Sequence, residues 1–187
     1  MSICERHQAS IKGSGTQTTR DDFCKIFTQN MKGLYLLSLL LTADHTLAEQ
    51  CFAAGMEECV EGNPVFKEWA HAWSRRVIIK NAIRIVSPLS PQRHAGELKF
   101  NDEWETELRP ALVAIMQLQP LERFVYVMSV LERYSDHECF ALLSGTRDQV
   151  ITARTRALQR LSVVDDIYIG VGEALGKLLR PESQIQL

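Results

Sequence analysis

The chain of 187 residues lacks the features that mark disulfide-rich and membrane proteins. Its five cysteines are odd in number and form no CxxC pair, which favours reduced thiols over a disulfide framework. The apolar run at residues 34–41 is far shorter than the roughly 20 residues that a membrane-spanning helix needs. Residues 1–20 are polar and do not have the pattern of a signal peptide. We therefore expect a cytoplasmic protein with no membrane span.

The parts of a catalytic or metal site are also missing from the sequence. Its five histidines are scattered, with no nucleophile or ligand constellation around them, and it contains no glycine-rich phosphate loop. His45, Cys51 and Cys59 do not follow a known metal-ligand spacing, so we interpret the cysteines as buried structural residues. The sequence predicts no enzyme activity, no metal, no cofactor and no small-molecule substrate.

The net charge of −2 is small, but the charges are segregated along the chain. Residues 44–62 contain five acidic residues and no Lys or Arg. Residues 67–86 contain five basic residues and one acidic residue, and residues 142–161 contain four arginines and one aspartate. This pattern indicates two basic helices separated by acidic material, which is more informative than the total charge.

Apolar residues at helical spacing predict three helices in the first half of the chain, at about residues 22–41, 46–62 and 66–86. Pro88 and Pro91 then end the helical pattern. We expect a disordered leader over residues 1–21, a helical domain over residues 22–86 and a linker over residues 87–102.

The second half predicts further helices at about residues 103–117, 120–132, 135–143, 146–161 and 163–179. No stretch of the sequence shows the sustained alternation of a strand. The predicted fold class is therefore all-α, with two small helical domains joined by a linker. The second domain covers residues 103–161, and a C-terminal helix and tail cover residues 162–187.

Two capping-box patterns lie eleven residues apart in the second domain. Ser135 is followed three residues later by Glu138, and Thr146 by Gln149, with a Ser-Gly turn between the two pairs. Two capped helices around a tight turn form a helix-turn-helix, whose second helix enters the DNA major groove. The alternative is a helical hairpin with a solvated, arginine-bearing face.

The second helix of this motif divides into two faces. Val150, Ala157 and Leu161 share one face and can pack on the preceding helix. An Arg or Gln near the helix start can read base edges, while the later arginines suit phosphates. The predicted DNA-binding residues on this helix are Arg147, Gln149, Thr152, Arg156 and Arg160.

Both halves of the chain carry the motifs of a known family. The second half contains LQPLERFVYVMSVLERYSDHECFALLSGTRDQVITARTRALQRL, which resembles region 4 of sigma-70 family transcription factors, particularly the short extracytoplasmic-function type. The first half contains LYLLSLLLTADHTLAEQCFAAGM and FKEWAHAWSRRVIIKNAIR, which resemble region 2 of the same family. The resemblance covers about residues 22–86 and 103–161 and includes the order of the domains and the position of the linker.

The resemblance implies a transcription initiation factor whose partners are core RNA polymerase and promoter DNA. Its first domain would bind the polymerase and open the DNA, and its second would read the upstream promoter element. The implied polymerase-binding residues are Glu49, Gln50 and Glu57, and the residues at the melted DNA are Arg75, Arg76, Lys80 and Arg84. The C-terminal helix packs on the second domain or, alternatively, docks an anti-sigma protein.

Aromatic residues lie on the basic helix of the first domain. Trp69 and Trp73 are four residues apart, so they share one face of a helix. They can stack on an exposed base of a melted strand, as in proteins that bind single strands. The interpretation that we favour places both rings in the hydrophobic core.

The chain departs from the family pattern at contact positions. Gln50 replaces an acidic residue of region 2, and Ala53 and Ala54 replace its following Gln and Glu. Ile151 and Ala153 replace two basic positions of the region 4 recognition helix, and Arg154 replaces an apolar one. These changes motivate an alternative function, a sigma-like regulator or interaction protein that does not initiate transcription.

Overall fold

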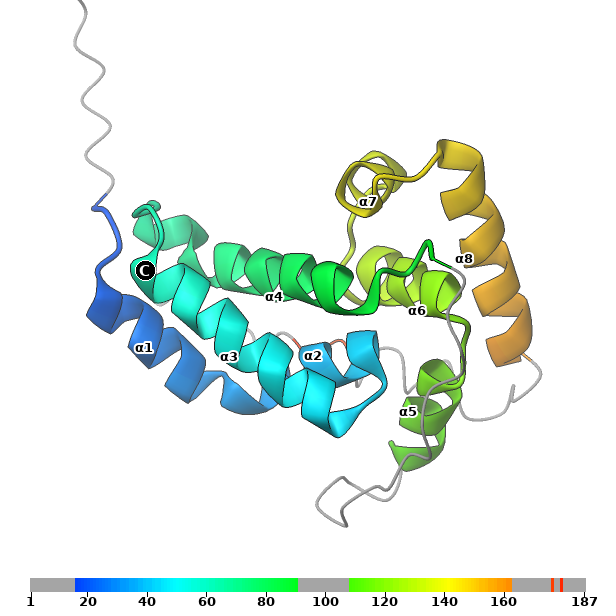
Figure 1. Cartoon of the computed structure of the whole chain (residues 1–187), viewed down its shortest axis with the longest axis horizontal. Coiled ribbons are helices and arrows are strands. Elements are labelled where there is room, and N and C mark those ends of the chain that lie inside the picture. The colour runs from blue at the N-terminus through cyan, green and yellow to red at the C-terminus, as the bar shows by residue number, and fades with distance from the viewer. Residues whose placement is uncertain (1–15, 91–107, 163–175, 177–178, 180–187) are drawn as a thin grey trace, which may run out of the picture.

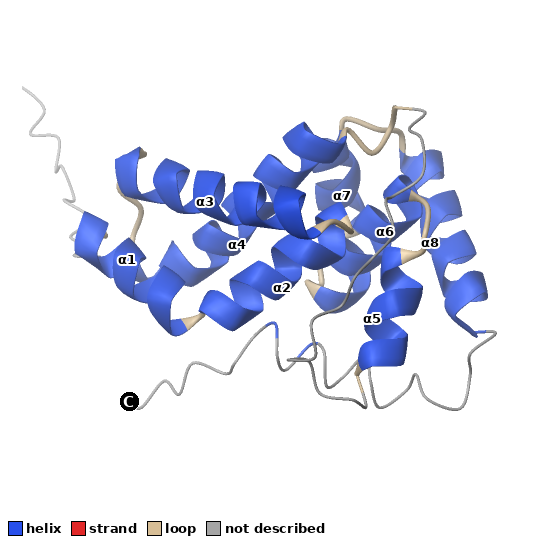
Figure 2. Cartoon of the chain, turned by 60° about the horizontal axis from the view of Figure 1, so that its bottom comes forward, coloured by secondary structure: helices blue, strands red, loops and turns tan. Residues whose placement is uncertain are grey.

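The computed structural model describes residues 16–90 and 108–162 together with Gly176 and Leu179. The fold over these residues is all-α, as the sequence predicts (Figure 2). The described residues form no strand, and the single isolated bridge pairs Gln17 with Phe66. None of the helices in this part of the chain has the length and apolar composition to cross a membrane.

The first half of the chain folds into four α-helices (Figure 1). The helix predicted at residues 22–41 is divided at Asn30, whose backbone leaves the helical region (φ −107°, ψ 22°). The chain changes direction there, and the helix that follows, residues 31–42, runs through the core with nine of its twelve residues buried. The elements are α1 (Arg20–Gln29), α2 (Met31–Thr42), α3 (His45–Glu61), the 3₁₀ turn η1 (Lys67–Trp69) and α4 (Ala70–Val86).

Local capping decides where these helices begin and end. The Asp44 side chain accepts a hydrogen bond from the Leu47 amide at 2.8 Å, so α3 begins one residue before the predicted Thr46. Helix α4 ends at Val86 and is capped by Ser87, which adopts a left-handed conformation (φ 49°) immediately before Pro88.

The chain is already ordered within the segment predicted to be a disordered leader. The Thr18 amide donates to the Val65 carbonyl at 2.7 Å, and the Lys67 amide donates to the Thr16 carbonyl at 3.0 Å. Thr19 then forms a capping box with Asp22 that starts α1. Backbone pairing with Val65 and Lys67 therefore anchors Thr16 and Thr18, within the segment that the sequence predicts to be disordered.

The second half contains α5 (Arg109–Met116), α6 (Pro120–Tyr126), the π-helical turn η2 (Val127–Leu131), α7 (Asp136–Leu143) and α8 (Arg147–Ser162). Pro120 occupies the first turn of α6, as predicted. Most of the segment predicted as linker and all of the C-terminal helix except Gly176 and Leu179 lie outside the described residues.

Both predicted capping boxes are present in the structure. Ser135 and Glu138 exchange hydrogen bonds at the start of α7, with the Glu138 amide 3.3 Å from the Ser135 hydroxyl. At the start of α8, the Thr146 amide lies 2.8 Å from Gln149 Oε1, and the Gln149 amide lies 3.2 Å from the Thr146 hydroxyl. The two helices meet at Ser144, which is left-handed (φ 56°).

The two sets of helices, α1–α4 and α5–α8, pack against each other through α2, which contacts α3 and α4 as well as α5 and α6. Their buried apolar residues form one continuous cluster. Arg123 of α6 reaches across and donates hydrogen bonds from Nε to the Leu41 carbonyl at 3.1 Å and from Nη2 to the Thr42 carbonyl at 3.5 Å. The division into two domains stays a prediction.

Candidate nucleic-acid interface

Four predicted DNA-binding residues lie on α4, and the structure places each beside an acidic residue. Lys80 and Arg84 lie on the part of α4 that packs on α3, and Arg75 and Arg76 face the segment between η2 and α7. The two pairs of cations therefore have different kinds of partner, one within α1–α4 and one in α5–α8.

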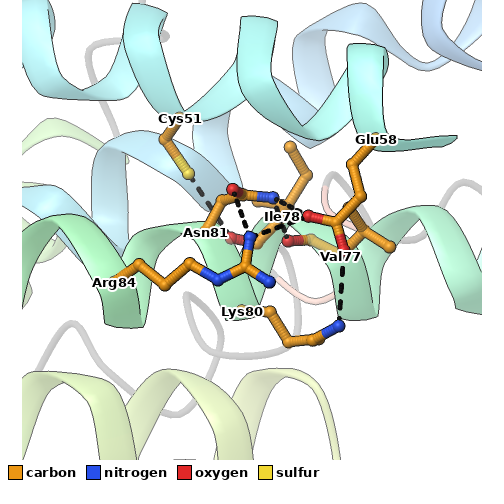
Figure 3. Close-up of polar contacts among 7 residues, drawn as sticks. All are labelled: Cys51, Glu58, Val77, Ile78, Lys80, Asn81 and Arg84. Carbon is orange, nitrogen blue, oxygen red and sulfur yellow. Dashed lines mark hydrogen bonds and ion pairs between the residues drawn. The ribbon is translucent and has the colours of Figure 1, made fainter. Parts of the chain in front are cut away.

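Glu58 of α3 holds the C-terminal pair of cations (Figure 3). Its Oε1 lies 3.3 Å from Lys80 Nζ, and its Oε2 lies 3.0 Å from Arg84 Nη1. Asn81, which is buried, donates to the same carboxylate at 3.0 Å. Partial burial acts to raise the pKa of Glu58, but hydrogen bonds from Asn81, Arg84 and Lys80 outweigh it and hold the pKa below 4.5.

Glu132 holds Arg75 from the other set of helices. The guanidinium approaches both carboxylate oxygens, with Nε 2.7 Å from Oε2 and Nη2 against Oε1. Its third nitrogen donates to the carbonyl of Leu179, which is buried. The Glu132 side chain is 3% exposed and that of Arg75 is 13% exposed, so this pair is largely removed from water.

Arg76 faces Tyr134 and Glu138 at the same junction. Burial raises the pKa of Tyr134, while the neighbouring Arg76 charge acts to lower it. Hydrogen bonds from the Ser135 backbone and hydroxyl lower the pKa of Glu138, and Arg76 contributes further in the same direction. Arg76 therefore also lies in a partly buried polar contact between the two sets of helices.

An open hollow of about 340 Å³ lies beside these contacts. The interpretation of both tryptophans as core residues is wrong for Trp69, whose side chain packs edge-on against Phe66 and is 60% exposed. Trp73 is half-buried and packs against the core. The hollow is lined by Trp69, Ala72, Trp73, Arg76, Glu132, Arg133, Tyr134 and Glu138.

The predicted DNA-binding residues of α8 are more open. Arg147, Thr152 and Arg156 are exposed and make no hydrogen bond or ion pair with side chains in the described part of the chain. Gln149 is exposed, but its Oε1 accepts from the Thr146 amide and serves the helix cap. Arg160 lies 3.3 Å from Glu122 and is therefore paired within the protein.

The other face of α8 packs as predicted, with Val150, Ala157 and Leu161 buried. Ala153, which replaces a basic residue of the family pattern, is also buried. Arg154 stands where the region 4 pattern has an apolar residue. It forms a two-point contact with Asp136 at the start of α7 and so joins the two helices. Ala153 and Arg154 therefore both support the packing of α8.

The predicted polymerase-binding residues lie on the outer face of α3. Glu49, Gln50 and Glu57 are all exposed there, and Ala53 lies exposed between them. The face pointing the other way is buried through Ala48, Cys51, Gly55 and Cys59. This arrangement leaves one side of α3 open to a partner.

The sequence analysis missed the acidic partners Glu58, Glu122, Glu132 and Asp136. The pairing of Glu58 with the basic helix could have been predicted. The acidic residues 44–62 precede the basic residues 67–86, and opposite charges favour the packing of neighbouring helices. Arg75 and Glu132 are 57 residues apart, and no local spacing in the sequence indicates their pairing.

Cys51, Cys59 and Cys139 are buried, as predicted, and burial raises the pKa of each thiol to about 11, whereas Cys24 is only half-buried. Among the residues that the structure describes, no group of three or more His, Cys, Asp or Glu residues is placed to hold a metal ion. The chain shows no significant match to a protein-family model, to a curated protein or to a solved structure.

Proposed function

We propose that the protein is a transcription initiation factor of the sigma-70 type, which binds core RNA polymerase and directs it to a promoter. The observation that carries the proposal is the α7–α8 pair, in which two capped helices meet at a left-handed residue and Arg147, Thr152 and Arg156 stay exposed. In a helix-turn-helix the start of the second helix is offered to the major groove, and the capped start and exposed arginines of α8 support this role for it.

Helix α8 reads the upstream promoter element in this proposal. Arg147 lies in its first turn, where a guanidinium can reach the O6 and N7 atoms of guanine. Arg156 lies further along and suits a phosphate. Gln149 and Arg160 have structural partners, so they contribute to DNA binding less than the sequence alone suggests.

Helix α3 supplies the contact with core polymerase in this proposal. Glu49, Gln50 and Glu57 form its exposed polar face, and α4 lies behind it with the cations that follow the melted strand. The protein itself makes or breaks no covalent bond in this function. Its binding to polymerase and to DNA, together with the deformation of the DNA, accounts for promoter opening.

The test mixes the purified full chain with core RNA polymerase and follows complex formation by gel filtration. Promoter-directed transcription by the complex is then measured on a template library with randomised upstream elements. We expect a stable complex and a selected upstream motif. Failure of the folded protein to bind polymerase at micromolar concentration would sink the proposal.

Replacing Arg147 with Ala is expected to relax the preference at one or two positions of the upstream element, with a loss of about 1–3 kcal/mol in discrimination. The measurement is binding to the selected element and to its single-base variants. Arg156→Ala is the matched control, because a lost phosphate contact weakens all sequences alike and lowers the salt slope by about 0.9. Equal sequence profiles for wild type and Arg147→Ala would contradict base reading by Arg147.

A second candidate is a sigma-like regulator that binds a partner without initiating transcription. The observation that favours it is the pairing of the α4 cations with Glu58 and Glu132, which occupies groups needed for DNA opening. Polymerase binding without promoter-directed transcription is the outcome that selects this candidate.

A further inference from the structure

We propose that α5–α8 mask the nucleic-acid-binding face of α4 in the free protein, and that a single-stranded nucleic acid must displace Glu132 to reach it. This inference rests on the proposed function, in which α4 contacts the melted strand. The inference adds a closed state of the free protein, in which the Glu132 carboxylate occupies the place on Arg75 that a phosphate of the nucleic acid would take.

The Arg75–Glu132 contact provides the first support. A guanidinium presents a fork of donors that suits a carboxylate or a phosphate with two parallel hydrogen bonds. Glu132 already fills this fork with both of its oxygens, and the Leu179 carbonyl takes the third nitrogen. Three of the five guanidinium N–H donors of Arg75, including the Nε–Nη2 fork that would suit a phosphate, are therefore occupied in this arrangement.

The neighbouring Arg76 lies at the same junction. Tyr134 and Glu138, which flank the cap of α7, lie beside its guanidinium. The partly buried Trp73 lines the same hollow as these residues. A strand that follows α4 and stacks on Trp73 has to enter this hollow, which Glu132, Tyr134 and Glu138 line from the other set of helices.

Lys80 and Arg84 behave differently, because their partner Glu58 belongs to α3. Their pairing does not depend on where α5–α8 lie. Opening the molecule therefore releases Arg75 from its ion pair with Glu132 and leaves Lys80 and Arg84 paired with Glu58 as before.

Such a contact can exchange with a nucleic acid. Separating Glu132 from Arg75 alone leaves two charges that are largely buried, which is costly. A phosphate that replaces the carboxylate restores the two-point contact on Arg75, and water then solvates the released Glu132. The contact therefore resists spontaneous opening and yields to a ligand with the chemistry of a phosphodiester.

The test compares Glu132→Gln with wild type in the full chain. Fluorescence anisotropy with a fluorescein-labelled 12-nucleotide single-stranded DNA measures affinity over a range of salt concentrations, and small-angle X-ray scattering measures the radius of gyration. Glu68→Gln is the matched control, because it makes the same change in net charge beside α4 at an exposed residue that has no ion pair within the described chain.

We expect Glu132→Gln to bind the strand about tenfold more tightly, the effect of one recovered charge-assisted contact. Its salt slope should steepen by about 0.7, the contribution of one phosphate contact on a single strand. Its radius of gyration should rise, while Glu68→Gln stays within about twofold of wild type in affinity and keeps its radius.

Two results overturn the inference. Folded Glu132→Gln that binds like Glu68→Gln shows that Glu132 does not mask α4. Tighter binding with unchanged scattering shows that the charge matters but the closed arrangement does not. If Glu132→Gln loses its helical circular dichroism, Glu132→Asp takes its place, because the shorter side chain weakens the two-point contact on Arg75 without a change in net charge, and wild type is then the charge-matched control.

Gel filtration of the same proteins with core polymerase separates this inference from the proposed function. Polymerase binding without any gain in strand binding overturns the masking alone. A gain in strand binding without polymerase binding overturns the proposed initiation function and leaves the masking of α4 standing.

Discussion

At the scale of single residues, Arg123 shows how one side chain links the two sets of helices. Its guanidinium donates to the carbonyls of Met116 and Leu118, which precede α6, and to those of Leu41 and Thr42 at the end of α2. Burial lowers its pKa to about 10, which still leaves the residue charged at neutral pH. The cation thus satisfies carbonyls that a helix end leaves unpaired.

Replacing Arg123 with Met is expected to lower the free energy of unfolding by about 3 kcal/mol or more, because several buried carbonyls lose their only charged donor. Urea unfolding followed by circular dichroism measures the change. Arg156→Met is the control, since this exposed residue should alter stability by no more than about 0.5 kcal/mol. A loss below 1 kcal/mol for Arg123→Met would show that water replaces the guanidinium.

At the scale of elements, Glu58 fastens α3 to α4 through three donors on one helix. Its side chain is 31% exposed, so solvent screens these contacts and reduces their contribution. The pKa of Glu58 is lower in the folded protein than its ordinary value of 4.5. The unfolded chain therefore binds more protons in this range, and the stability from Glu58 is present above pH 4.5 and is lost as the pH falls through the folded pKa.

We expect Glu58→Gln to be less stable than wild type by about 0.5–1 kcal/mol at pH 7, with a difference that shrinks as the pH falls below 4.5. Urea unfolding across this pH range gives the measurement. Glu57→Gln serves as the control, because Glu57 points to solvent from the same helix. A difference that stays constant down to low pH would contradict the role of the Glu58 charge.

At the scale of the whole molecule, the continuous apolar cluster predicts that the two sets of helices unfold together. In a Trp104→Phe background, the fluorescence of Trp69 and Trp73 reports on α4, and circular dichroism reports on all helices. The two urea transitions are expected to coincide. A circular dichroism transition that continues after the fluorescence change is complete would show that α5–α8 unfold independently.

Much of the fold was predictable because its signals are local. The periodicity of apolar residues indicated helices at nearly every position where the described chain has them, and both capping boxes of the α7–α8 pair were visible as residues three apart. The break at Asn30 was not predictable, since apolar residues continue through it at helical spacing. Trp69 was misjudged because its ring lies at the start of α4, where the packing partner is Phe66 at the surface.

The sequence by itself determined the all-α class, the buried face of α8 and the charge of the candidate binding helices, since each depends on residue types at short spacing. Only the tertiary structure decided which of those charged side chains are exposed to solvent and which are paired within the protein. Arg147 and Arg156 stay exposed, while Arg75 meets Glu132 across the two sets of helices. Such a pairing depends on how helices pack at long range, and the spacing of residues along the chain carries no record of it.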